Sequence, residues 1–189
     1  MIGAMAGSVR MDRIKVGLPP IARADARLFI LGSLPGDASL SARRYYAHPT
    51  NQFWRLLGHA LGEELQPLDY DDRLRRLAER RIGLWDVIAS ASRRGSLDQA
   101  IRAAAHNRLE QLRDDFPELR ALAFNGSAAA AAGRRLLGSP QGLTLVELPS
   151  SSAANTRPFA HKAAAWSALG PLIDSWDLPR AASAPRWRS

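Results

Sequence analysis

Short apolar runs alternate with helix-patterned stretches along this chain, and that alternation constrains the fold more than any other feature. The apolar runs predict four strands, at residues 27–31, 83–88, 119–124 and 143–148. The spacing of apolar residues elsewhere predicts helices at residues 51–62, 70–81, 97–104, 108–116, 127–137 and 159–176. Strands that alternate with helices favour a parallel sheet covered on both faces, with right-handed crossovers between the strands.

Two polar residues mark expected helix starts. Ser96 and Asn107 each precede a predicted helix, and the side chains of serine and asparagine accept hydrogen bonds from the first N–H groups of a helix. We therefore expect Ser96 to cap the helix at 97–104 and Asn107 to cap the helix at 108–116.

The length of 189 residues suits one compact domain. We expect a flexible N-terminal segment at residues 1–17, a single domain at 18–177, and a disordered basic tail at 178–189, which is rich in proline, alanine and arginine. No run approaches the roughly 18 apolar residues of a membrane helix. The first residues also lack the apolar core of a signal peptide. The sequence thus predicts a cytoplasmic protein without a membrane partner.

Side chains that bind metals or redox centres are either missing or badly spaced. The chain has no cysteine, which excludes disulfides, cysteine-ligated zinc, iron–sulfur clusters and a thiol nucleophile. Its 4 histidines are scattered, without the spacing of metal ligands. We therefore expect neither a metal nor another cofactor.

Positive charge gives the first indication of a partner. Lys and Arg together outnumber Asp and Glu by 26 to 18, and almost all of the basic residues are arginines. Guanidinium groups pair well with phosphate, so this balance favours a polyanion such as nucleic acid. An arginine- and alanine-rich composition also arises from GC-rich coding, and charge alone leaves both explanations open.

Polar and turn-forming residues follow each predicted strand. These are residues 32–36 after the first strand, Asp86 at the second, Asn125 after the third, and residues 149–152 after the fourth. Ligands of open α/β sheets bind beyond the carboxyl ends of the strands, so we expect the functional site there. Ordinary turn chemistry explains glycine, proline and serine at such places. It explains less well an Asp or Asn set directly against an apolar strand.

The turn Gly-Ser-Leu-Pro-Gly at residues 32–36 matches neither a phosphate loop nor a dinucleotide-binding fingerprint nor a nucleophile elbow. What remains is a rigid turn that presents backbone N–H groups, because Pro35 fixes one φ angle and Gly36 permits close approach. Such a turn can bind a carbonyl oxygen of a flat heterocycle. The following segment, RRYYAHPTNQFW at 43–54, adds tyrosine rings on which a base can stack. Core packing of the tyrosines and a structural hydrogen bond of His48 are the alternatives.

Five segments taken together, GSLPGDASL, YYAHPTNQFW, GLWDVIASASRRGSLDQAI, AFNG and LPSSSAAN, resemble the uracil-DNA glycosylase superfamily. They are most similar to its hypoxanthine-DNA (deoxyinosine) glycosylase branch, and the resemblance spans residues 18–173. It implies a three-layer α/β/α sandwich on a central four-stranded parallel sheet. The implied activity is that of a monofunctional DNA glycosylase in base-excision repair, acting as a monomer. It flips a deaminated base out of the DNA and hydrolyses its N-glycosidic bond.

The resemblance assigns roles residue by residue. Leu34 stands where the mismatch-specific uracil branch has the Asn of a G-I-N-P-G turn that handles the attacking water, and Leu cannot activate water. Tyr46 stands where that branch has a Phe that stacks on the base. Asn125 matches the Asn of the FNG motif, which matters for catalysis in the deoxyinosine branch. Ser150 stands where other branches place a stronger donor, His or Asn.

The complete set of candidate residues forms three groups. The catalytic candidates are Asn125 and Ser150. The base-binding candidates are Gly32, Ser33, Leu34, Pro35, Gly36, Asp37, Tyr46, His48 and Asp86. The DNA-binding candidates are Ser151, Ser152, Asn155, Arg157 and Lys162.

Three other functions stay open at this point. The departures at Leu34 and Ser150 favour a purine such as hypoxanthine, with uracil and xanthine as further substrates, but a uracil- or mismatch-specific glycosylase is the nearest alternative. A non-catalytic module that binds damaged DNA is the second alternative, and Leu34 favours it. A small-molecule hydrolase is the third, and the positive charge speaks against it.

Overall fold

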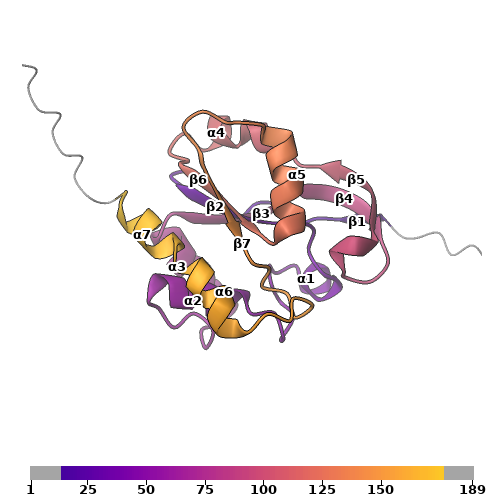
Figure 1. Ribbon diagram of the computed structural model, residues 1–189, viewed down its shortest axis with the longest axis horizontal. Coiled ribbons are helices and arrows are strands. Elements are labelled where there is room, and N and C mark those ends of the chain that lie inside the picture. Colours follow the sequence, from indigo (N-terminus) through magenta and orange to yellow (C-terminus); the bar gives the residue numbers. More distant parts are fainter. Residues whose placement is uncertain (1–13, 177–189) are drawn as a thin grey trace, which may run out of the picture.

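A four-stranded parallel sheet forms the centre of the computed structural model, which describes residues 14–176 (Figure 1). Its strands lie in the order β3-β2-β6-β7, and all three neighbouring pairs are parallel. They are β2 (Leu28–Gly32), β3 (Ile82–Asp86), β6 (Ala121–Asn125) and β7 (Thr144–Leu148). This sheet confirms the predicted α/β class, and each strand begins and ends within two residues of its predicted range.

Alternate residues of the central strands point to opposite faces of the sheet, and each face packs against its own layer of helices. In β2, Leu28 and Ile30 join one apolar cluster while Phe29 and Leu31 join the other. The first cluster packs under α2 (Phe53–Leu61), α3 (Tyr70–Glu79), α6 (Phe159–Trp166) and α7 (Leu169–Asp174). The second packs under α4 (Leu112–Asp115) and α5 (Ser127–Leu137). The three-layer sandwich is therefore confirmed, and Figure 1 shows α6 beside α2 despite their distance in sequence.

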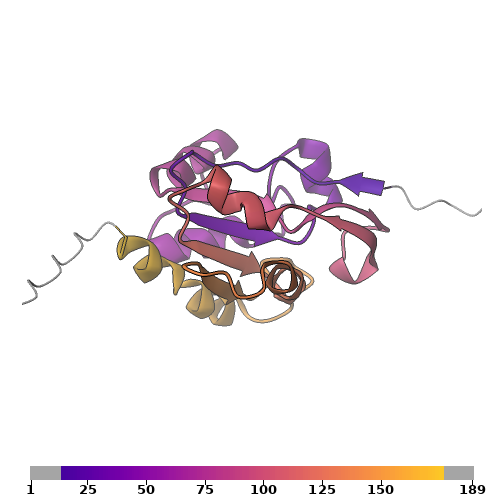
Figure 2. The same ribbon diagram turned by 90° about the horizontal axis from the view of Figure 1, so that it is seen from above.

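A second sheet was not predicted. It is antiparallel, in the order β1-β4-β5, and consists of β1 (Ile14–Val16), β4 (Ile88–Arg93) and β5 (Ile101–His106). In Figures 1 and 2, β1 and the β4–β5 hairpin lie together at the right-hand end of the molecule. The predicted strand at 83–88 is in fact split between the two sheets at Val87, whose N–H donates to the Gly32 carbonyl oxygen at 2.8 Å.

The helix predicted at 97–104 is wrong. Only a short 3-10 turn, η1 (Asp98–Ala100), precedes strand β5 there. Pairing with β4 overrides the helix propensity of the alanine-rich segment, because tertiary contacts outweigh a weak local preference. Ser96 does serve a helix start, although a distant one: its Oγ accepts the N–H of Asp37 at 3.0 Å, at the first residue of α1 (Asp37–Ala42).

Two further predicted helices are shorter than expected. The segment 108–116 contains η2 (Leu109–Gln111) and α4, and the Asn107 side chain donates to the Asp86 carbonyl oxygen at 2.9 Å instead of capping a helix. The segment 159–176 divides into α6 and α7. Pro171 lacks an N–H group and therefore belongs in the first turn of a new helix rather than within a continuous one.

The expected domain boundary at residue 17 is also wrong, because Ile14–Val16 pairs with β4. The rest of the expected flexible segment, residues 1–13, and the expected basic tail lie outside the described residues. Within residues 14–176, no helix has the length and apolar character needed to cross a membrane.

Because α5 packs closely on β6, we expect that replacing Gly133 with alanine destabilises the protein. A Cβ atom there would lie 2.2 Å from Cε1 of Phe124, whose ring is buried. Gly133→Ala should therefore lower the free energy of unfolding by about 1–3 kcal/mol, the usual cost of overpacking. Alanine normally stabilises a helix by about 1 kcal/mol relative to glycine. The sign of the change in the free energy of unfolding therefore distinguishes overpacking from helix propensity.

Urea denaturation of four proteins measures this effect: the wild type, Gly133→Ala, Phe124→Leu and the double variant. The smaller Leu side chain makes room for the new methyl group, so Gly133→Ala should cost less in the Phe124→Leu background. An increase in stability for Gly133→Ala alone would contradict the described packing of α5.

Candidate functional site

The four parallel strands end together, and their polar ends lie side by side. Gly32 of β2 is opposite Asp86 of β3, Leu31 is opposite Phe124 of β6, and Asn125 is opposite Leu148 of β7. The structure therefore brings Gly32, Asp86 and Asn125 to one edge of the sheet, where the sequence placed the candidate site.

The β2 turn, residues 32–36, leaves the sheet tightly against Asp86. A Cβ atom at Gly32 would lie 2.5 Å from Oδ1 of Asp86, so any larger residue at this position would displace the Asp86 carboxyl group. The carbonyl oxygens of Gly32 and Ser33 accept the N–H groups of Val87 at 2.8 Å and Ile88 at 2.9 Å. These bonds fix the start of the turn on the segment that joins the two sheets.

A buried arginine fixes the rest of the turn. Arg93, at the end of β4, is only 2 % exposed. Its Nη1 donates to the Leu34 carbonyl oxygen at 2.9 Å, and its Nη2 donates to that of Pro35. Burial lowers the pKa of the Arg93 guanidinium, an effect that the nearby carboxylates of Asp98, Asp37 and Asp86 oppose. The guanidinium fork thus holds two successive peptide groups in one orientation.

The loop of the β4–β5 hairpin, residues 94–97, adds further bonds to the same turn. On one side of this hairpin loop, Ser33 Oγ donates to Asp98 Oδ1 at 2.5 Å. On the other, Lys15 of β1 donates to the carbonyl oxygen of Gly95 at 2.6 Å and forms an ion pair with Asp37. Asp37, a base-binding candidate, is exposed and forms this ion pair with Lys15.

Leu34 faces the antiparallel sheet. Its side chain is buried in a small apolar cluster with Ile88 and Ala91, against which Ile101 and Ala104 pack. This burial agrees with a role for Leu34 in shape alone, because an apolar side chain packed among others neither binds nor activates water.

Asp86 is buried without a full set of partners. It is 3 % exposed, and within the described residues its Oδ2 has no hydrogen-bond partner. Burial raises the pKa of Asp86 to about 8; the nearby Tyr45 hydroxyl and the charge of Arg93 oppose this shift, and the charge of Asp98 adds to it. A carboxyl group with this pKa holds its proton at neutral pH and can donate a hydrogen bond.

Tyr46 lies against the same turn in a strained backbone conformation. Its φ is 54°, a left-handed value that non-glycine residues rarely adopt. Its ring stacks on Phe53 with centroids 3.6 Å apart, and its buried hydroxyl has no hydrogen-bond partner among the described residues. Burial also raises the pKa of this hydroxyl, mainly by desolvation. Phe53 occupies one face of the ring that the resemblance assigns to base stacking.

His48 lies apart from this cluster. It is exposed, and its Nδ1 lies 2.9 Å from Oγ1 of Thr50. The local hydrogen bond is the structural alternative that the sequence left open for this residue.

Asn125 and Ser151 form a reciprocal pair. Asn125 Nδ2 donates to Ser151 Oγ at 2.8 Å, and the Ser151 N–H donates to Asn125 Oδ1 at 2.8 Å. Asn125 therefore orients the β7 loop, residues 149–157, while one of its two Nδ2 hydrogens remains for another acceptor. Ser150 lies against Gly126, and its Oγ accepts the Ser152 N–H at 3.2 Å.

Lys162 secures the β7 loop from inside. It is 1 % exposed, and its Nζ donates to Gln52 Oε1 at 3.0 Å and to the Asn155 carbonyl oxygen at 2.7 Å. The Gln52 N–H in turn donates to the Ser151 carbonyl oxygen at 2.9 Å. Burial lowers the pKa of the Lys162 ammonium group.

Two of the expected DNA contacts are therefore corrected. Lys162 and Ser151, which is 0 % exposed, are buried and bonded within the protein, so neither reaches a phosphate. Ser152 Oγ accepts the N–H of Ala154 at 3.2 Å, and the Asn155 side chain donates to the Ser150 carbonyl oxygen at 3.0 Å, so both also shape the loop.

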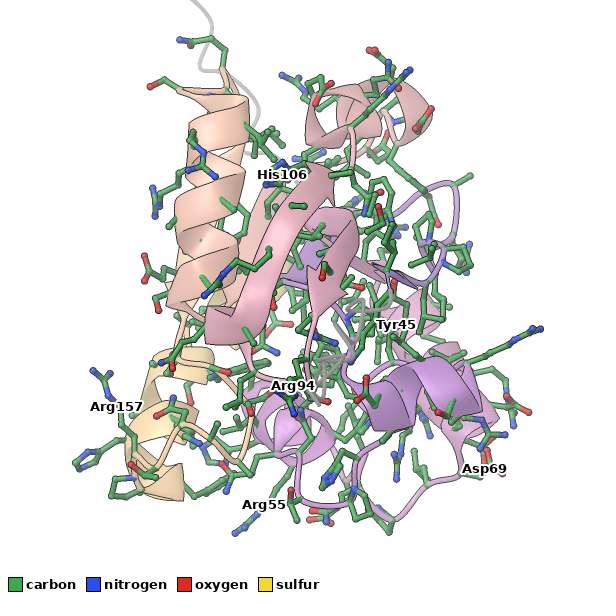
Figure 3. All side chains as sticks on the ribbon, turned by 90° about the vertical axis from the view of Figure 1, so that its right-hand side faces the viewer. Tyr45, Arg55, Asp69, Arg94, His106 and Arg157 are labelled. Carbon is green, nitrogen blue, oxygen red and sulfur yellow. The ribbon has the colours of Figure 1, made fainter. Side chains whose placement is uncertain are left out.

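Exposed arginines surround the strand ends. Figure 3 shows Arg157 projecting outward from the β7 loop and Arg94 at the lower end of the β4–β5 hairpin. Arg43 and Arg44, which follow α1, are exposed as well. Their positive charge can meet phosphates on either side of the strand ends.

Sequence reasoning missed the residues that hold the two loops. These residues are Arg93, Asp98 and Gln52. They act through contacts with residues far away in the chain, and no local pattern distinguishes them from surface residues.

In the part of the chain that the structure describes, no group of three or more acidic or histidine side chains is placed to hold a metal ion.

The burial of Asp86 predicts a dependence of stability on pH. Its carboxyl group has an ordinary pKa of 3.8, which burial raises to about 8 in the folded protein. Between these values the folded state holds one proton more than the unfolded state, so this group makes the free energy of unfolding fall as pH rises. The slope is at most about 1.4 kcal/mol per pH unit.

Urea denaturation between pH 5 and 8 isolates this effect when the wild type is compared with Asp86→Asn, whose amide does not titrate. The stability of the wild type relative to the variant should decline steadily across this range. A difference that stays constant with pH would mean that Asp86 is ionised in the folded protein.

Comparisons with known proteins show which family the chain resembles. A sequence model of the Uracil DNA glycosylase superfamily matches residues 19–170. A Methanosarcina acetivorans protein named "Hypoxanthine DNA glycosylase" is 42% identical over 156 residues, which are 82% of this chain and 98% of that protein. A Methanosarcina barkeri protein of the same name is 39% identical over 153 residues, 81% of this chain and 96% of that one.

Similarity extends to a solved structure. An M. acetivorans protein determined by solution NMR, described as a candidate uracil DNA glycosylase, superposes with a TM-score of 0.76 at 40% identity. The match covers 86% of this chain and 99% of the other. The similarity therefore includes both the fold and the segments that form the strand-end site.

Proposed function

The chain belongs to the uracil DNA glycosylase superfamily and is a DNA glycosylase, and we propose that the base it removes is hypoxanthine, from deoxyinosine in DNA. The observation that carries the proposal is the 42% identity over 98% of a protein named for hypoxanthine excision. The apolar Leu34 in the β2 turn supports it, since this turn lacks a group that handles water. The proposal includes action as a monomer, because one chain supplies every candidate group of the site. It also includes a location in the cytoplasm.

The reaction breaks the bond between C1′ of the deoxyribose and N9 of the purine. Its transition state has the character of an oxocarbenium ion, as in glycoside hydrolysis. Negative charge develops on the leaving base, so preorganised hydrogen-bond donors aimed at the base are the main means of catalysis. Water then adds to C1′, and the base takes up a proton.

Three kinds of hydrogen-bond donor at the strand ends suit this task. They are the backbone N–H groups of the β2 turn, the remaining Nδ2 hydrogen of Asn125, and the hydroxyl of Ser150. The bonds of Arg93 and Ser151 hold the turn and the amide in place before the substrate arrives. Fixed donors need no reorganisation as the charge develops, which is why their effect is large.

The attacking water needs little activation in such a scheme. An oxocarbenium ion is a strong electrophile, so a water molecule adds to it without a strong base nearby. The buried Leu34 is compatible with this route, whereas a mechanism that ionises water first requires a carboxylate or an equivalent base at the sugar.

Excision assays with labelled DNA test the substrate directly. Duplexes that carry inosine, uracil, xanthine or a mismatched thymine are incubated with the protein, and abasic sites are revealed by alkali. We expect inosine to be excised fastest. Faster excision of uracil than of inosine would favour a uracil- or mismatch-specific glycosylase. Binding of the damaged duplexes without any abasic product would favour a non-catalytic module.

The Asn125 amide provides the sharpest test of the mechanism. Asn125→Asp keeps the oxygen that accepts the Ser151 N–H but removes the donor and adds a negative charge beside the leaving base. Excision of hypoxanthine under single-turnover conditions should fall by about 10²-fold or more, the scale of losing one preorganised donor.

Ser151→Ala serves as the control for the structural part of this pair. It removes the Oγ acceptor of Asn125 but keeps the backbone bond to Oδ1. Its excision rate should stay within about tenfold of wild type, since one neutral hydrogen bond contributes roughly 1 kcal/mol. Equal losses in the two variants would mean that Asn125 only holds the β7 loop.

A further inference from the structure

Three polar side chains from different segments meet where the strands end. Asp86 ends β3, Asn125 ends β6, and Tyr46 lies in the segment between α1 and α2. An atom at the Cβ position of Gly32 would lie 2.5 Å from Oδ1 of Asp86 and 3.4 Å from the Tyr46 hydroxyl oxygen, so these two groups lie over the same glycine. The Asn125 side chain is close enough to the Tyr46 hydroxyl to affect its pKa. The three side chains therefore form one cluster at the start of the β2 turn.

Two buried oxygen atoms of this cluster have no partner. Oδ2 of Asp86 and the hydroxyl oxygen of Tyr46 lack a hydrogen bond within residues 14–176. Buried polar atoms in proteins are almost always hydrogen-bonded, because an unpaired one costs the full free energy of its desolvation. Both atoms lie beside the turn that is expected to bind the base, so a polar atom of the base can complete the hydrogen bonds of the cluster.

The surroundings of Asp86 keep its proton in place at neutral pH. Burial raises the pKa of its carboxyl group to about 8, and the charge of Asp98 on η1 adds to this shift. The Tyr45 hydroxyl and the charge of Arg93 on β4 oppose it. Burial also raises the pKa of the Tyr46 hydroxyl. At neutral pH the cluster therefore offers a carboxyl proton and carries no negative charge.

A purine that leaves DNA needs a proton as well as hydrogen bonds. The electron pair of the C1′–N9 bond passes into the base as the bond breaks, and a purine anion is a poor leaving group. Protonation at N7, in the ring that also contains N9, makes the departing base neutral. A general acid placed for this transfer typically contributes a factor of about 10²–10⁴ to the rate. The N–H groups of the β2 turn and of the Asn125 amide donate hydrogen bonds but do not give up a proton.

We propose that Asp86 is the general acid that protonates the hypoxanthine base as it leaves. This inference rests on the proposed substrate and adds a proton transfer to its excision. As the C1′–N9 bond breaks and its electron pair passes into the purine, the carboxyl proton of Asp86 moves to N7. Water then adds to C1′ and releases one proton to solvent, and the Asp86 carboxylate takes up a proton from solvent before the next reaction. In the interval the Tyr46 hydroxyl, over the same glycine, can donate a hydrogen bond to the carboxylate.

Single-turnover excision from a duplex that carries inosine, measured between pH 6 and 9.5, tests the proposal. The wild-type rate should be constant at low pH and fall by about tenfold per pH unit above the pKa of Asp86, because only the protonated carboxyl group acts. Asp86→Asn keeps the shape of the side chain and can donate a hydrogen bond, but an amide does not give up a proton. Its rate at pH 6.5 should be about 10²-fold lower than that of the wild type and should not change with pH.

Two variants with the same change of carboxyl group to amide serve as controls. Asp114→Asn alters an exposed residue of α4 and should change neither the rate nor its pH dependence. Asp98→Asn keeps an oxygen that can accept the Ser33 hydroxyl but removes the charge that raises the pKa of Asp86, so the fall in rate should begin at lower pH. Asp98→Asn and the wild-type profile carry the test if Asp86→Asn does not unfold cooperatively in urea.

Three results would overturn the proposal. The first is a cooperatively folded Asp86→Asn protein with a rate within about threefold of wild type, which would mean that Asp86 only donates a hydrogen bond. The second is a wild-type rate that does not fall between pH 7 and 9.5, and the third is a fall that begins at the same pH in Asp98→Asn as in the wild type. Absence of inosine excision by the wild type at pH 6.5 would instead overturn the proposed substrate, and the proton transfer with it.

Discussion

The buried guanidinium of Arg93 is the interaction on which the site depends. It donates to two successive carbonyl oxygens, those of Leu34 and Pro35, and so fixes the turn that follows the central strand β2. Burying a cation costs several kcal/mol unless hydrogen bonds and opposite charges offset the loss of water. Two carboxylates nearby, those of Asp98 and Asp37, supply the opposite charge.

Different parts of the fold hold the two segments that form the site, the β2 turn and the β7 loop. The β4–β5 hairpin fixes the β2 turn, while Lys162 and Asn125 fix the β7 loop from the helical layer and from strand β6. Both cations are almost fully buried, so they act on the protein and not on phosphate. Catalysis through fixed donors requires this kind of support, since a donor that must first be ordered contributes less to the rate.

The sequence predicts the parts of the structure that depend on local patterns. The four apolar strands and the polar residues at their ends follow from periodicity, and so do the positions of Asp86 and Asn125 at one edge. The antiparallel sheet escapes prediction because residues 101–106 are rich in alanine and form a strand only by pairing with β4. The burial of Arg93 and Lys162 escapes it as well, because their acceptors lie on segments far away in the chain.

The central claim is that the hairpin arginine holds the β2 turn in the geometry that catalysis needs. Arg93→Lys tests it most directly, because lysine keeps the charge but cannot donate to both carbonyl oxygens as the guanidinium fork does. The single-turnover excision rate at saturating DNA should fall by about 10²-fold, the effect expected from a small misplacement of catalytic groups. A cooperatively folded Arg93→Lys protein with a rate within about threefold of wild type would contradict the account.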